Sequence, residues 1–294
     1  MANLKEVRNR IASVNSTQQI TKAMKMVAAA KLRRAQENIT QMRPYAQKLS
    51  QMLSTVSAGA ESVSENPYNT TRPVERVLII VITSDRGLCG AFNTNVAKAA
   101  LNRISEQYAD QNQQGNVKIL AIGKKGAETM ARRGFDVNAT FVNTFSNLSF
   151  ATVRAAAEEV MDDFRVGQFD VVELIFNESL NVATQVIRLE QMLPIVPAPA
   201  DPKTSGSQAN YIFEPSEEEI ITELIPKTLK IQLYKAVLES NASEHGARMT
   251  AMDKATDNAG ELLKQLKLVY NRTRQAAITT EILEIVGGAE ALAN

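Results

Sequence analysis

The stretch LKEVRNRIASV, residues 4–14, sets the pattern for the N-terminal part of the chain. Its apolar side chains recur at alternating spacings of three and four residues, and this spacing continues unbroken to residue 56. The positions are Leu4, Val7, Ile11, Val14, Gln18, Thr21, Lys25, Ala28, Leu32, Ala35, Ile39, Met42, Ala46, Leu49, Leu53 and Val56. Such a seam is typical of a helix that packs along a second helix with coiled-coil geometry. We expect one long helix over residues 3–57, kinked or interrupted at Pro44.

Only three positions of this seam are polar: Gln18, Thr21 and Lys25. Four apolar residues stand beside them, just off the register of the seam: Ile20, Met24, Met26 and Val27. One interpretation is a local stutter in the supercoil. The other is a second apolar surface that faces an external partner, and the pattern alone favours neither.

The N-terminal helix is also strongly basic. Residues 1–48 contain ten lysines and arginines against two glutamates, a balance of +8 in a chain whose net charge is +1. A solvated helix face is the ordinary explanation of such a charge run. Attraction to an acidic partner, either a protein or a nucleic acid, is the functional alternative.

The C-terminal end mirrors the first. Ser216, followed by three glutamates, predicts a helix start, and the helical pattern runs to Val286, where Gly287 and Gly288 predict its end. A second seam lies within it at Met252, Ala255, Ala259, Leu262, Leu266 and Val269. Two long seams at opposite ends of one chain predict an antiparallel coiled coil built from both termini.

Between the two ends, short apolar strands alternate with helices. The pattern predicts strands over 76–83, 117–122, 171–176 and 182–188, and helices over 93–108, after 124 and over 149–164. Such alternation indicates a Rossmann-like α/β domain with a mainly parallel sheet. The expected fold class is therefore α/β, with an N-terminal coiled-coil helix over 1–60, an inserted α/β domain over 70–210 and a C-terminal coiled-coil helix over 211–294.

The loop SDRGLCGAFN, residues 84–93, follows a buried strand, where phosphate-binding loops occur. It matches neither the Walker nor the dinucleotide-binding glycine pattern, and Gly87 and Gly90 suit a tight strand-to-helix turn. Cys89 and His245 are the only cysteine and histidine, so no disulfide or cysteine-based metal cluster is expected. Asp253, Asp257 and Glu261 are interleaved with lysines, as on a solvated face. We predict no catalytic, cofactor or metal site.

The sequence offers no segment for spanning or crossing a membrane. The longest apolar run, residues 77–82, is far shorter than the ~20 residues of a spanning helix. Met1–Arg10 is already charged and helix-like, unlike a secretory leader. We expect a protein of the cytosol, or one attached to a membrane through other proteins.

Three blocks of this sequence resemble one family, the gamma subunits of the F-type ATP synthases, which form a central rotor shaft. The first two are ITKAMKMVAAAKL (20–32) and TSDRGLCG (83–90). The third comprises ARM (247–249), ATDNA (255–259), LVYNR (268–272) and RQAAITTEI (274–282). Because the order and spacing of the blocks agree along the whole chain, the resemblance implies one family domain over 1–294.

The resemblance implies a subunit without a catalytic site or cofactor of its own. Alternating alpha and beta subunits would surround the coiled coil, and rotation of this asymmetric shaft would couple proton flow through the membrane sector to ATP synthesis or hydrolysis on beta. The epsilon subunit and the c-subunit ring would be further partners, and no nucleic acid would bind. The location implied is the cytoplasmic side of a bacterial inner membrane, as a peripheral protein.

The resemblance also assigns contact residues. Those matching positions that bind the beta subunit are Met24, Lys25, Arg248, Gln275, Thr279 and Glu281. Those matching a segment near the c ring and the epsilon subunit are Tyr211 and Glu214.

Two rival functions remain open from the residues themselves. A nucleic-acid-binding coiled coil would use the basic helix and would bind in a salt-sensitive way, although Tyr45 is the only aromatic residue there to stack on a base. An α/β enzyme would use the loop at 85–93 and would bind nucleotide without any partner.

Overall fold

The computed structural model describes residues 4–57, 66–181, 184–195 and 217–293. The chain divides into two compact units: Ala29–Ala247 form the larger one, and Met1–Ala28 with Arg248–Asn294 form the smaller one. Two long helices, α1 (Leu4–Ser57) and α6 (Glu217–Ala293), contribute to both units. None of the described helices has the length and hydropathy that a membrane span requires.

The larger unit is built around a five-stranded sheet in the order β3-β2-β1-β4-β5. The strands are β1 (Val77–Ile82), β2 (Val117–Ile122), β3 (Asp136–Asn138), β4 (Val171–Ser179) and β5 (Gln185–Leu193). The first four strands pair in parallel, and only β5 is antiparallel, to β4. Every residue of β1 is buried, which explains why its sequence VLIIVI is a continuous apolar run without alternation. The predicted mainly parallel sheet is confirmed.

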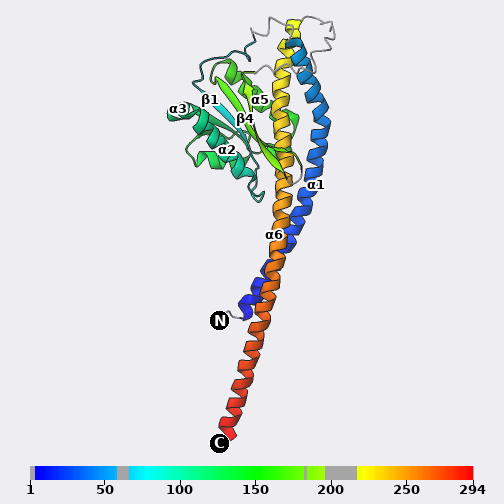
Figure 1. The fold of residues 1–294 in the computed structure, drawn as a ribbon, viewed down its shortest axis with the longest axis vertical. Coiled ribbons are helices and arrows are strands. Elements are labelled where there is room, and N and C mark those ends of the chain that lie inside the picture. The colour runs from blue at the N-terminus through cyan, green and yellow to red at the C-terminus, as the bar shows by residue number, and fades with distance from the viewer. Residues whose placement is uncertain (1–3, 58–65, 182–183, 196–216, 294) are drawn as a thin grey trace. The chain divides into compact units, whose positions relative to one another are not determined.

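Helices cover both faces of this sheet. Those that follow strands are α2 (Phe92–Gln107), α3 (Ala109–Gln113), α4 (Lys124–Ala131) and α5 (Phe150–Arg165), with a 3-10 turn at Thr144–Asn147. On one face, α5 and α6 pack against side chains such as Ile80 and Leu174; on the other, α2 and α4 pack against Ile79 and Ile175. Figure 1 shows β1 and β4 between α2 on one side and α5 and α6 on the other.

Within the larger unit, α6 also packs against α1. Leu32 and Ile39 of α1 share a buried cluster with Leu238 and Ala242 of α6. Five successive residues of α6, 236–240, are all buried. Because five residues complete more than one helical turn, α6 is covered on every side at this level.

The prolines and glycines inside the two long helices interrupt neither of them. α1 continues through Pro44, and α6 continues through Pro226, Gly287 and Gly288 to Ala293. The predicted end of the helix at Gly287 is therefore wrong. A glycine costs a helix only about 1 kcal/mol relative to alanine, and the good helix formers that follow offset this cost.

In the smaller unit, α1 and α6 run antiparallel, because Thr21 of α1 contacts Thr256 while the later Lys25 contacts the earlier Asp253. The buried apolar side chains along this seam are Val7, Ala28, Met252, Ala259, Leu263 and Leu266. The predicted antiparallel pairing of the terminal helices is confirmed here. Val269 was expected to continue the seam, but it is 44% exposed.

Candidate partner-binding site

Side chains and a loop of this chain occupy the edge of the sheet at which α/β folds bind ligands. Such sites lie at the carboxyl ends of parallel strands where the strand order reverses, here beside β1 and β4. Asn177, near the end of β4, donates a hydrogen bond from Nδ2 to the carbonyl oxygen of Phe92 at 3.3 Å. Cys89, Phe92 and Ala247 form a buried cluster, which places α6 against the loop after β1. Cys89 is thus a buried packing residue.

Hydrogen bonds within the loop hold its shape. The backbone N–H of Ser84 donates to Asn93 Oδ1 at 2.9 Å, and Asn93 Nδ2 lies 3.2 Å from Cys89 Sγ. Asp85 Oδ1 accepts from the backbone N–H of Lys124 at 3.1 Å. Partial burial raises the pKa of the Asp85 carboxyl above its ordinary value. The first N–H of α4, a group that could bind an anion, is therefore taken by a carboxylate of the chain.

The turn at the end of this loop uses a glycine at only one of the two expected positions. Gly90 has a φ of 61°, in the left-handed region that favours glycine. The other left-handed residue is Leu88, with a φ of 65°, whereas Gly87 is not among the glycines of positive φ. The structural interpretation of Gly90 is confirmed.

In the smaller unit, the three polar residues of the N-terminal seam still face α6. The hydroxyl oxygens of Thr21 and Thr256 lie 2.8 Å apart, and Gln18 Nε2 donates to the carbonyl oxygen of Thr256 at 3.4 Å. Lys25 Nζ lies 2.5 Å from Asp253 Oδ1. A polar layer thus replaces apolar packing in an unbroken seam, and the register of α1 shows no stutter.

The apolar residues beside this polar layer are exposed. Ile20 is 59% exposed, Met26 62% and Val27 57%, while Met24 is half-buried. Ile20 and Val27 are seven residues apart, two helical turns, and so share one face of α1. We call Ile20, Met26 and Val27 the Met26 patch. Clustered large apolar side chains on a surface mark an interaction site more often than scattered ones do.

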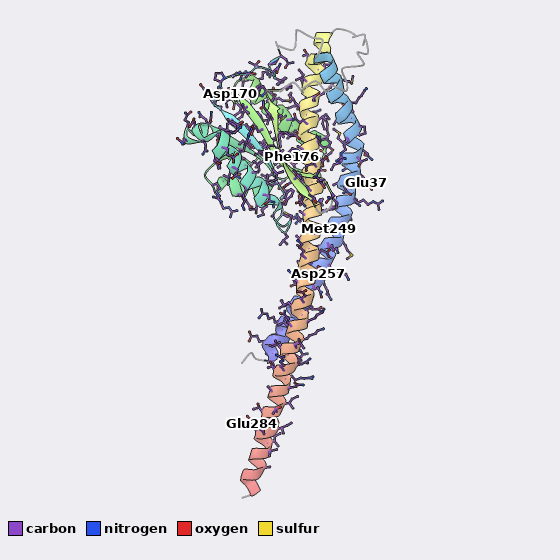
Figure 2. All side chains as sticks on the ribbon, viewed as in Figure 1. Glu37, Asp170, Phe176, Met249, Asp257 and Glu284 are labelled. Carbon is purple, nitrogen blue, oxygen red and sulfur yellow. The ribbon has the colours of Figure 1, made fainter. Side chains whose placement is uncertain are left out.

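A second exposed apolar surface covers the end of α6. Ile278, Ile282, Leu283, Ile285 and Val286 are all exposed, and we call them the α6 tip. Glu284 lies among them, on the turns of α6 that extend beyond the N-terminal end of α1 (Figures 1 and 2). No described residue of α1 covers these turns, so the tip offers a helix with apolar side chains to a partner.

The contact residues assigned by resemblance differ in exposure. Met24 and Arg248 are half-buried, and Lys25 is half-buried within its ion pair. Gln275, Thr279 and Glu281 are exposed on α6, as a contact role requires.

The structure brings only two of the α6 contact residues together. Thr279 Oγ1 donates to the carbonyl oxygen of Gln275 at 3.0 Å, one turn earlier. At ~100° per residue, Glu281 points to the opposite side of α6 from Thr279. Tyr211 and Glu214 lie outside the described residues, as does the expected helix start at Ser216.

Sequence reasoning missed the partners of the polar layer. Asp253 was assigned to a solvated acidic face, yet it binds Lys25 across the seam. A signal was available, because a polar residue at a seam position needs a polar partner opposite it. Only the register of two helices far apart in the sequence identifies that partner as Asp253.

Comparisons with known proteins agree with one another. The model of the ATP synthase family matches residues 3–292. The chain is 61% identical to the ATP synthase gamma chain of Cytophaga hutchinsonii over all of both chains, and 55% identical to that of Flavobacterium johnsoniae over 99% of each. Its fold is similar to a chain of the Euglena gracilis mitochondrial ATP synthase, with a TM-score of 0.66 and 20% identity, covering 98% of this chain and 94% of that one.

Proposed function

The chain belongs to the ATP synthase gamma-chain family, and from this premise we propose that it is the rotating shaft that couples proton flow to ATP synthesis and hydrolysis. The reaction takes place on another subunit, and this chain contributes no catalytic group and holds no cofactor. Its partners are the alpha and beta subunits of a catalytic ring, the epsilon subunit and the c-subunit ring of the membrane sector.

The observation that carries the proposal is the exposed apolar surface of the smaller unit. The Met26 patch and the α6 tip leave large side chains in water that a closed core would bury. A ring of subunits around the two helices would cover them. The α6 tip has few charges, so a sleeve around it makes few directional contacts and lets the helix turn.

Coupling requires contacts that differ between rotary positions. Two helices of unequal length and composition present a different face to each beta subunit, which biases each beta toward a different open or closed state. In this proposal Met24 and Lys25 meet beta near the Met26 patch. Arg248, Gln275, Thr279 and Glu281 meet it elsewhere on α6, in some rotary positions only.

The larger unit has an anchoring role in this proposal. Its closed sheet edge supports a structural use of the α/β fold over a catalytic one. Tyr211 and Glu214 bind the c ring and epsilon, and this attachment holds the chain at the cytoplasmic face of a bacterial inner membrane. The functional parts are the helix over 1–60, the α/β domain over 70–210 and the helix over 211–294.

Purification from the native membrane in mild detergent tests the proposal. We expect the tagged chain to bring down alpha, beta, epsilon and the c ring with ATPase activity. We expect calorimetry of the isolated chain to detect no micromolar site for ATP. Recovery of the chain alone, or with nucleic acid, would refute the shaft function, and a micromolar nucleotide site would favour the α/β enzyme.

A further inference from the structure

Lys25 stands at the point where the proposed contact with beta meets the helix seam. It is one residue from Met26 of the exposed patch, yet its ammonium group is bound by Asp253 of α6 at 2.5 Å. Lys22, one turn earlier, is exposed. Lys22 forms no ion pair with any residue that the structure describes, whereas Lys25 is paired with Asp253 of α6.

The polar layer fixes which residue faces Lys25. The hydroxyl oxygens of Thr21 and Thr256 lie 2.8 Å apart, and each hydroxyl is also within donating distance of a carbonyl oxygen one turn earlier in its own helix, that of Gln18 at 3.0 Å and that of Met252 at 2.7 Å. Gln18 reaches the carbonyl oxygen of the same threonine. Polar contacts inside a coiled-coil seam specify register, because any slip leaves them buried without partners. This register brings Asp253, one turn before Thr256 along the chain, opposite Lys25.

The ion pair contributes little to the stability of the helix pair. The side chain of Lys25 is 40% exposed and that of Asp253 is 48% exposed. Pairs this open to water gain little, because solvent screens the charges and both side chains lose rotamer freedom. What the pair does control is the position of one positive charge beside the Met26 patch.

We propose that Asp253 is a positioning residue for the contact between this chain and the beta subunit. It holds the Lys25 ammonium on the seam as one half of an ion pair, so that Lys25 meets beta as a paired group and not as a second unpaired cation next to Lys22. Without Asp253, Lys25 swings outward and pairs with an acidic group of beta in one rotary position only. That extra contact stabilises one rotary state over the others and uncouples rotation from catalysis. The inference rests on the proposed function.

The experiment uses the whole complex, reconstituted in vesicles, with ATPase rate and ATP-driven proton pumping measured on the same preparation. We expect Asp253→Asn to lower the protons pumped per ATP at least threefold. Adding Lys25→Gln to that variant should restore most of the ratio, because it removes the freed cation and keeps a polar side chain of similar length for the contact with beta. Asp253→Glu, which keeps the carboxylate, should also pump better than Asp253→Asn.

Asp257→Asn is the matched control. It removes the same charge one turn further along α6, from an exposed residue that forms no ion pair with any described residue (Figure 2). Its pumping ratio should equal that of the parent. A charge effect of α6 as a whole would instead lower the ratio in both variants, and this result would overturn the proposal.

Two further results would overturn it. One is a normal pumping ratio with Asp253→Asn. The other is a double variant that pumps no better than Asp253→Asn. An Asp253→Asn complex that assembles or melts less well than the parent would likewise make the residue merely structural and overturn the proposal. Failure of the proposed function gives a different result: the parent chain itself does not assemble with alpha and beta.

Discussion

The two units use their apolar side chains in opposite ways. Among the described residues, the largest fully buried side chains all lie in the larger unit, and they include Phe92, Phe164 and Phe176. Figure 2 labels Phe176 within this unit. The smaller unit has about a quarter of the residues, yet it carries ten of the eighteen large apolar side chains that are exposed in the described chain. The larger unit completes its own core, whereas the smaller unit leaves apolar surface for a partner. Changes in the first should therefore affect stability, and changes in the second should affect activity.

The largest effect should come from Gly123→Ala in the larger unit. Gly123 has a φ of 106°, and an added Cβ would lie 2.0 Å from the carbonyl oxygen of Thr83. We expect the free energy of unfolding to fall by about 3 kcal/mol or more, measured by denaturant titration. Gly134→Ala is the control, because Gly134 has a φ of 89° with open space around it, and it should lose only about 1 kcal/mol. Equal losses would show that the close approach to Thr83 does not matter.

In the smaller unit, Arg248→Ala or Gln275→Ala should spare stability and reduce turnover. A hydrogen bond of a charged group is worth roughly 1.5–3 kcal/mol, enough to lower steady-state ATPase and ATP synthesis about tenfold if it forms in only some rotary positions. Gel filtration and turnover on one preparation test this. Normal turnover would mean that the residues only solvate the helix, and failed assembly would mean that they are structural.

Met24→Lys should lower the protons pumped per ATP several-fold while the chain stays folded. It adds a cation to a turn that already holds Lys22 and Lys25, and an extra ion pair with beta would hold one rotary state too firmly. ATP-driven proton pumping should fall more than the yield of assembled complex. A variant complex that pumps and synthesises like the parent would contradict the proposed contact at Met24.

The smallest effect concerns the pH dependence of the larger unit. Burial, together with the hydrogen bond that Tyr108 Oη donates to Glu173 Oε1 at 2.8 Å, raises the pKa of Tyr108 above its ordinary value near 10. The folded state thus keeps this proton longer than the unfolded state, so stability is full below about pH 10 and falls as the pH rises further.

Tyr108→Phe tests this dependence by unfolding titrations at pH 9 and pH 11. The variant should start about 1 kcal/mol less stable, because it lacks the hydrogen bond, and should lose less on going to pH 11. An equally steep loss in both proteins would assign the dependence to other groups.

Sequence reasoning predicted those parts of the fold that depend on local pattern. The strand predicted over 76–83 and the helix predicted over 149–164 both follow from runs and periods within a few residues, and the structure has them at Val77–Ile82 and Phe150–Arg165. The structure adds that Ser149 caps this helix, because its Oγ accepts from the backbone N–H of Thr152. The pattern did not reveal β3, because Asp136–Asn138 has no apolar run. It also placed the last strand too early, because β5 extends to Leu193.

The candidate site was less predictable, because it depends on pairing between distant segments. The exposure of the Met26 patch follows only once Thr21 and Lys25 are known to face α6. Val269 is exposed although it continues the apolar spacing of α6. Nothing in the sequence of α6 itself shows that packing against α1 ends before this residue. The contact residues for beta came from family resemblance, and their roles stay predictions.

The burial of α6 on every side at residues 236–240 has a mechanical meaning. A helix packed on one face can roll about its own axis by sliding over its neighbour. Here, rolling α6 would drag Leu238 out of its contact with α1 and Val237 out of its contact with the sheet and α5 at the same moment. Packing around its whole circumference therefore holds this part of α6 against rotation relative to the rest of the larger unit. A torque applied to α6 would reach the rest of the larger unit through all of these packing contacts together and would not depend on any single bond.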